Sequence, residues 1–193
     1  ENMPNPARTA EIWRDEARKH GIGEIYLMRV ESIGKCDPAE IGFDAALEFA
    51  PDWWNKGVEL YSYPRQGGET EENLLSYDQF HADNHVHRYD SLVETMMAKP
   101  TPDYKWLQCV TPSWDNTARR KEGAHVFLDA TPDKYQRWLE KTIASAESRL
   151  IGDEKMVFIN AWNEWAEGNY LEPDQEFGRQ YLEATRAALR TRH

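Results

Sequence analysis

The chain has 193 residues, of which 40% are hydrophobic and 12% aromatic, and its formal net charge at pH 7 is −11. This length suits one domain with a sizeable core, and this share of hydrophobic residues excludes a disordered chain. We expect no nucleic-acid partner, because phosphates require a basic surface, and no membrane span in this chain, because no apolar run approaches the roughly 20 residues that a span needs.

The first part of the chain predicts one helix and two strands. An asparagine and a proline at its start and a glycine after its end predict a helix over residues 5–20, with Ala10, Trp13 and Ala17 on its apolar stripe. β-Branched and aromatic side chains predict a strand over 24–30, which Glu31 directly follows, and a second strand is expected over 45–49, closed by Pro51. A long loop is expected over 52–77, and its Trp and Tyr side chains could line a glycan groove or pack the loop onto the fold.

The next segment raises the possibility of a metal site. Residues 81–87 contain three histidines and an aspartate, but their spacing fits neither one helix face nor a zinc knuckle, so we interpret them as a polar loop. Cys36 and Cys109 are too few and too far apart for a disulfide framework. A glycine-rich phosphate loop is also absent from the sequence. We therefore expect no metal and no cofactor.

The second half continues the alternation of strands and helices. A helical stripe capped by Asp90 precedes a third strand at 106–110, and apolar positions after Thr131 recur with the period of a helix that buries one face. Residues 156–162 are apolar at nearly every position, as in a strand buried on both faces of a parallel sheet, and Asp174 starts a last helix. The pattern favours a right-handed parallel βα series.

Polar and acidic residues cluster directly behind the fourth strand. Glu164 and Glu167 are three residues apart and fall on one side if the chain turns helically there. Two acids in different surroundings can divide into a proton donor and a base, which glycosidic bond cleavage needs. Trp162 and Trp165 could supply an apolar wall and a flat face for a sugar ring, with Asn163 between the first of them and Glu164. Alternatively, both glutamates are solvated loop charges.

A second polar group follows the third strand. Trp114 could stack on a sugar face while Asp115 and Asn116 hydrogen-bond its hydroxyls, or the three could form a capped turn. Arg119 and Arg120 could orient an anionic group on the substrate, pair with the acidic rim or fix the loop. Both groups follow strands, where parallel α/β folds carry their chemistry.

Two segments resemble a known family. The run AWNEWAEGNYLEPDQEFGRQYLEAT, from Ala161 to Thr185, resembles the C-terminal signature of the WbsX-like proteins, and TPSWDNTARR, from Thr111 to Arg120, resembles their upstream signature. That family is named for polysaccharide-biosynthesis glycosyltransferases and is related to glycoside hydrolase family 99, whose W-N-E-W-x-E motif carries both catalytic carboxylates. The resemblance makes Glu164 and Glu167 the catalytic pair. Ala166 stands where family 99 hydrolases usually have His, which fits the WbsX-like branch and leaves the activity open.

The resemblance also implies a fold. It predicts a (β/α)8 TIM barrel, of which residues 1–193 would be a single unit, the C-terminal half with about four βα units. A half barrel exposes two sheet edges and an apolar face, so we expect the missing N-terminal half elsewhere or self-association. The compartment stays open between the cytoplasm and, where an export signal lies upstream, the periplasm or the exterior.

Three functions follow from the resemblance and the residues. The first is a retaining endo-type α-glycoside hydrolase in which the equivalent of Glu164 removes the 2-hydroxyl proton, giving a 1,2-anhydro sugar, and that of Glu167 protonates the leaving oxygen. The second is a glycosyltransferase in O-antigen or capsule polysaccharide biosynthesis, and the third is a non-catalytic glycan-binding module. In each case a glycan or polysaccharide is the partner. The expected substrate-binding residues are Trp114, Asp115, Asn116, Trp162, Asn163, Trp165 and Glu31.

Overall fold

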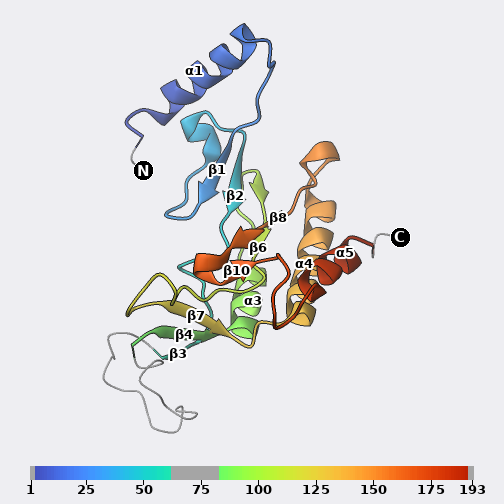
Figure 1. Ribbon diagram of the computed structural model, residues 1–193. Helices are drawn as coiled ribbons and strands as arrows, with labels where there is room; N and C mark the ends of the chain where they lie inside the picture. The colour runs from blue at the N-terminus through green and yellow to red at the C-terminus, as the bar shows by residue number, and fades with distance from the viewer. Residues whose placement is uncertain (1–2, 62–82, 191–193) are drawn as a thin grey trace.

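The computed structural model describes residues 3–61 and 83–190 and has a mixed α/β fold (Figure 1). Helix α1 lies at one end of the molecule with β1 and β2 beside it, whereas α4 and α5 pack against each other at its flank. The helices are α1 (Pro6–Lys19), α3 (Tyr89–Met97), α4 (Pro132–Arg149) and α5 (Gln180–Arg190), and the 3-10 turns are η1 (Pro38–Ile41), η3 (Gly152–Glu154) and η4 (Trp165–Glu167). None of the helices described is long and apolar enough to cross a membrane.

Parallel strands form the upper and central part of the molecule. Strands β1 (Met28–Glu31), β2 (Ala45–Glu48) and β5 (Trp106–Leu107) pair in that order, and β6 (Cys109–Val110) pairs with β8 (Phe158–Ile159). The predicted third strand is therefore confirmed but divides at Gln108, whose carbonyl accepts a hydrogen bond from the backbone N–H of Phe158. One residue separates β5 from β6, so the chain passes directly from the first parallel sheet into the second.

A third sheet, at the end opposite α1, was not predicted. Strand β3 (Glu59–Tyr61) runs antiparallel to β4 (His85–Arg88), which runs parallel to β7 (His125–Leu128) (Figure 1). The interpretation of 81–87 as a polar loop is thus wrong for its second half, and the long loop expected over 52–77 contains β3. The imidazoles of His85 and His125 face each other in register and stack at 4.5 Å, so histidine takes the place of apolar side chains here. Residues 62–82 of both predicted loops lie outside the described residues.

The long helix α4 organises the main core. Thr131 caps it, and its predicted buried face is confirmed. Helix α5 packs on α4 through Tyr181, whose ring meets Tyr135 edge to face at 5.6 Å. The predicted start of the last helix at Asp174 is wrong, because its carboxylate instead accepts hydrogen bonds from the next turn, at Phe177 and Gly178. The buried residues of α4 are Pro132, Tyr135, Trp138, Leu139, Thr142, Ile143 and Ala146.

Three further expectations need correction. Residues 156–162 do not form a strand buried on both faces: β8 spans two residues, 156–160 are half-buried, and Trp162 is 53% exposed. The reason is that β8 pairs only with β6 within the described residues, which leaves its other edge uncovered. Asp90 lies in the first turn of α3 and not at its cap, which is Arg88. Trp13 of α1 is 43% exposed, although Ala10 and Ala17 of its stripe are buried.

Candidate functional site

The segments that follow β6 and β8 are joined to each other. Parallel pairing of β6 with β8 brings the carboxyl ends of both strands to one edge. The backbone N–H of Asp115 donates a 2.8 Å hydrogen bond to the carbonyl oxygen of Glu167, and the Ser113 hydroxyl donates to the carbonyl of Gly168. The two sequence blocks around Trp114 and Trp165 therefore form one structural unit.

A buried amide and a glycine fix the geometry of this unit. Asn169 is fully buried, and its Oδ1 accepts hydrogen bonds from the Thr111 hydroxyl at 2.8 Å and from the Ala161 backbone at 3.1 Å. Gly168 has φ +56°, and a Cβ at this position would lie 2.9 Å from the carbonyl oxygen of Asp115. A larger residue would force the two segments apart, so the close approach requires glycine.

The two glutamates lie at the ends of one short turn. Strands β9 (Asn163–Glu164) and β10 (Asn169–Tyr170) form an antiparallel hairpin in which Glu164 is opposite Asn169. Between them, η4 makes a single helical turn, with Glu164 at its cap position and Glu167 as its last residue. This turn brings the carboxylates close enough for the charge of Glu164 to raise the pKa of Glu167.

Opposing effects act on the Glu167 carboxyl group, whose side chain is 20% exposed. Burial has the largest effect and raises its pKa, the guanidinium of Arg119 lowers it, and the charge of Glu164 raises it again. The distance from Arg119 Nη1 to Glu167 Oε1 is 2.5 Å. The net result is a pKa above the ordinary glutamate value, so this carboxyl group keeps its proton to a higher pH than a solvated glutamate does.

Glu167 opens into a cavity of about 290 Å³, called the arginine cavity below. Trp114 forms a wall of it and is only 2% exposed, with its ring edge against Trp53 at 5.3 Å. The side-chain oxygen of Asn116 accepts a hydrogen bond from the His125 backbone at 2.7 Å, so this amide also holds β7 in place. The described residues that line the cavity are Trp53, Trp114, Asn116, Arg119, Arg120, His125 and Glu167.

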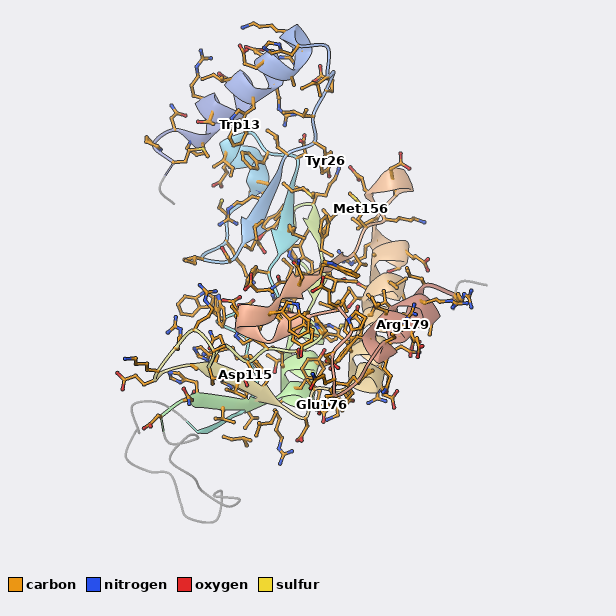
Figure 2. The ribbon with its side chains drawn as sticks, viewed as in Figure 1. Trp13, Tyr26, Asp115, Met156, Glu176 and Arg179 are labelled. Carbon is orange, nitrogen blue, oxygen red and sulfur yellow. The ribbon has the colours of Figure 1, made fainter. Side chains whose placement is uncertain are left out.

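A second cavity, of about 660 Å³, lies beside Trp165 and is called the acidic cavity below. Trp165 is 46% exposed and stacks on Tyr170 with ring centroids 3.7 Å apart and an interplanar angle of 16°, which gives a flat apolar surface. Asp115 and Glu176 line this cavity and lie in the part of the molecule away from α1 (Figure 2). Oδ1 of Asp115 already accepts two hydrogen bonds from Thr117. Flat rings flanked by carboxylates suit sugar faces and hydroxyls.

Some sequence-predicted residues do not line these two cavities. Trp162 and Asn163 are exposed on the approach to the hairpin, and Glu164 is half-buried. Glu31 ends β1 and is buried, where it accepts a 2.6 Å hydrogen bond from the Tyr104 hydroxyl. The structure thus brings Glu167, Trp114 and Asn116 to one cavity and Asp115 and Trp165 to the other.

Sequence reasoning did not single out two residues of the arginine cavity. His125 lies on β7, which carries no local signal that would connect it to Glu167. Trp53 was one of several aromatic residues of a long loop, with nothing to separate it from the others. Among the residues described, no group of three or more His, Cys, Asp and Glu has an arrangement that could hold a metal ion.

Comparisons with known proteins agree with the resemblance of the two blocks. The family described as Glycosyltransferase WbsX matches residues 1–185. The chain is 40% identical over 187 residues to "Uncharacterized protein WxcX" from two strains of Xanthomonas campestris pv. campestris, which covers 97% of this chain and 25% of each relative. It therefore spans about a quarter of the length of these curated relatives. A solved "Glycoside hydrolase-like protein" shares the fold with a TM-score of 0.55 at 13% identity, over 96% of this chain and 50% of that chain.

Proposed function

The chain belongs to the Glycosyltransferase WbsX family, and from this premise we propose that it contributes the two carboxylates of an enzyme that acts on glycosidic bonds. Glu167 is the acid and Glu164 the base. The observation that carries the proposal is the state of Glu167, which burial and Glu164 hold at a raised pKa beside a cavity. A raised pKa is what a proton donor needs at neutral pH.

We propose that residues 1–193 form one unit, the C-terminal half of a (β/α)8 barrel. The parallel order β1, β2, β5 with β6 and then β8 supports this, because each strand follows the previous one around a sheet. Within the described residues, β1 and β8 each have one edge without a neighbouring strand, which also supports the proposal. The shared fold over half of a glycoside hydrolase-like chain supports it as well. The remaining half is then supplied by further chain, as the longer relatives suggest, or by a second copy.

The proposed reaction is hydrolysis of an α-linked glycan with retention. The Glu164 carboxylate takes the proton of the sugar 2-hydroxyl, and that oxygen attacks the anomeric carbon. The bond from the anomeric carbon to the leaving oxygen breaks as Glu167 gives this oxygen its proton. Water then opens the 1,2-anhydro sugar: Glu167 takes a proton from the water, and Glu164 returns its proton to the 2-oxygen. Two inversions give retention.

The remaining site residues have supporting roles in this proposal. Trp165 stacked on Tyr170 offers its exposed face to a sugar ring, and Asp115 accepts hydrogen bonds from hydroxyls with the oxygen that Thr117 leaves available. Trp114 and Asn116 shape the wall beside Glu167. Trp162, Asn163 and Glu31 would contact more distant parts of the glycan in the complete barrel.

A second function is favoured by the family's own description. In a glycosyltransferase, the hydroxyl of an acceptor sugar would take the place of the attacking water, and Glu167 would activate it as base. This alternative needs a donor sugar with an anionic leaving group. Arg119 and Arg120 are cationic groups within reach of Glu167 that could face such a donor.

The test uses the full-length protein with an activated aryl glycoside and a natural-type glycan. Glu167→Gln should lose activity mainly on the glycan, whose poor leaving group needs a proton, whereas Glu164→Gln should slow both substrates. Glu183→Gln, an exposed glutamate of α5, is the matched control. Equal loss on both substrates in Glu167→Gln contradicts the acid role. Tight glycan binding without turnover of any glycoside or sugar nucleotide would identify a non-catalytic module.

A further inference from the structure

We propose that the arginine cavity binds an anionic group of the substrate, a carboxylate or a phosphate, through Arg119 and Arg120. The inference deepens the proposed function and rests on it, because it names the substrate class of the same site. The substrate is then an acidic glycan, or a sugar donor that carries phosphate. Three observations support it: the charges of the residues that line the cavity, the electrostatic effect of those charges on His125, and the hydrogen-bond donors that are available to a ligand.

The charge of the cavity differs from that of the chain. The chain carries a net charge of −11, yet two guanidinium groups line the cavity and Glu167 is the single carboxylate among its described lining residues. The planar fork of arginine presents five N–H donors and binds carboxylate and phosphate oxygens in pairs. A sugar hydroxyl can also accept from a guanidinium group, but it offers one neutral oxygen, whereas a carboxylate or phosphate offers paired oxygens and the opposite charge.

The electrostatic field points the same way. Burial, and after it the charges of Lys56, His85, His87 and Arg120, together lower the pKa of His125 to about 3. His125 is therefore neutral at pH 7, and the arginines carry the positive charge. Burial disfavours a charge of either sign, but the positive charges of Lys56 and Arg120, which disfavour a proton on His125, favour an incoming anion.

Donors remain available for such a group. Arg119 contacts Glu167 through Nη1 and is 54% exposed, which leaves other N–H groups of its fork for a ligand. Arg120 donates a long hydrogen bond of 3.4 Å to a neutral acceptor, the carbonyl of Gly123. The buried indole Nε1 of Trp114, a wall of the cavity, has no hydrogen-bond partner among the residues described. Trp53 opposite it keeps the cavity partly apolar, which strengthens charge interactions.

An anion in the cavity would also affect catalysis. The charge of Arg119, and to a lesser extent that of Arg120, lowers the pKa of Glu167. An anion bound to Arg119 neutralises this charge, so Glu167 holds its proton more tightly when substrate is present. The acid would thus be fully protonated only with an acidic substrate in place. Arg119 and Arg120 are binding residues in this inference, and the effect on Glu167 follows from their occupancy.

The experiment follows tryptophan signals in the full-length protein. 5-Fluorotryptophan is incorporated, and the fluorine NMR signals of Trp53 and Trp114 are assigned by Trp53→Phe and Trp114→Phe. The probes are inorganic phosphate, UDP, methyl α-glucuronide and, as neutral match, methyl α-glucoside. We expect the three anions to shift both signals and the glucoside to leave them in place. Tighter binding of the glucuronide assigns an acidic sugar, and tighter binding of UDP assigns a donor phosphate.

Variants connect these shifts to the arginines. Arg119→Gln with Arg120→Gln should weaken anion binding about tenfold or more, because charge-assisted hydrogen bonds are lost. Arg137→Gln, an exposed arginine of α4, is the matched control and should bind as before. Equal shifts with the glucoside, no shift with any anion, or unchanged binding in the double variant would overturn the inference. If turnover depends on Glu167 but the cavity binds no anion, this inference alone is rejected. If the cavity binds anions but turnover does not depend on Glu167, the proposed function is rejected.

Discussion

The hydroxyl of Thr111 donates a 2.8 Å hydrogen bond to the side-chain oxygen of Asn169, and both residues are fully buried. The first residue follows β6 and the second lies behind β8, so a side chain of each segment fixes the other. Buried polar groups need their partners, which makes the geometry of this pair specific. Every proposal about Glu167 depends on this connection, because Asn169 also accepts a hydrogen bond from Ala161 and so holds both ends of the segment that carries Glu167.

The close approach at Gly168 can be tested by adding one methyl group. Gly168→Ala should lower the free energy of unfolding by about 1–3 kcal/mol more than Gly152→Ala does. Both glycines have positive φ, +56° and +58°, but a Cβ at Gly152 meets nothing within 4 Å, whereas at Gly168 it meets Asp115 at 2.9 Å. The difference between the two variants in urea unfolding isolates the contact. Equal losses would mean that the two segments can separate without cost.

The main core depends on α4. Trp138→Ala should cost about 3–5 kcal/mol, because the indole is 1% exposed and its removal leaves a cavity against Tyr89. Trp54→Ala removes the same side chain at a position that is 78% exposed and should cost less than about 0.5 kcal/mol. Denaturant unfolding of both variants checks this. A loss below about 1 kcal/mol for Trp138→Ala would contradict the packing of α4.

A buried ion cluster at the end of β2 should be sensitive to pH. Lys99 Nζ lies 2.6 Å from Glu48 and 2.7 Å from Asp52, with all three side chains nearly inaccessible. Lys99→Met leaves two carboxylates without their cation and should cost about 3–5 kcal/mol at pH 7. The exposed Lys155→Met should cost little.

The sign of the pH dependence follows from Glu48. Burial raises its pKa, and Lys99 lowers it, so the variant should raise it further. A raised carboxyl pKa contributes stability that is complete below the unfolded pKa and is lost as the pH rises through the folded pKa. The deficit of Lys99→Met should therefore grow from pH 4 to pH 7. A deficit that is constant across this range would exclude titration of Glu48 as its cause.

Removal of Arg119 should change the titration of Glu167. The guanidinium lowers the pKa of this carboxyl group while burial and Glu164 raise it, so Arg119→Gln should move the already raised pKa further up. By the same linkage, the variant should lose stability relative to the unchanged protein as the pH rises above the ordinary glutamate value. Carbon-13 NMR of the glutamate carboxyl groups measures the shift. Arg137→Gln serves as control, and a lower pKa in Arg119→Gln would contradict the ion pair.

Much of the fold could be predicted where one period dominates the sequence. The helix after Thr131 repeats its apolar positions over many turns, and the strand at 45–49 is apolar except at Glu48, so both were found. Strand β4 was missed because histidines occupy alternate positions, and their burial comes from stacking on β7 rather than from their own polarity. Local sequence does not carry that information.

For the candidate site as well, local features could be predicted from the sequence and contacts between distant segments could not. The pair of glutamates and the two polar blocks are visible in the sequence because each is local. The contact of Arg119 with Glu167, and the presence of His125 in the same cavity, arise from pairing of distant strands and could not be read from spacing. The exposure of Trp162 was also missed, because an apolar run predicts a covered strand only when a neighbour lies on each side.

The hydrogen bond between Asp115 and Glu167 uses main-chain atoms of both residues. The position of the acid is therefore independent of which side chains stand at Asp115 or at Ala166, the next residue before it. Substitutions at these positions can alter what the site recognises while the carboxyl group stays where it is. What the site recognises and where its reaction centre lies can in this way change separately.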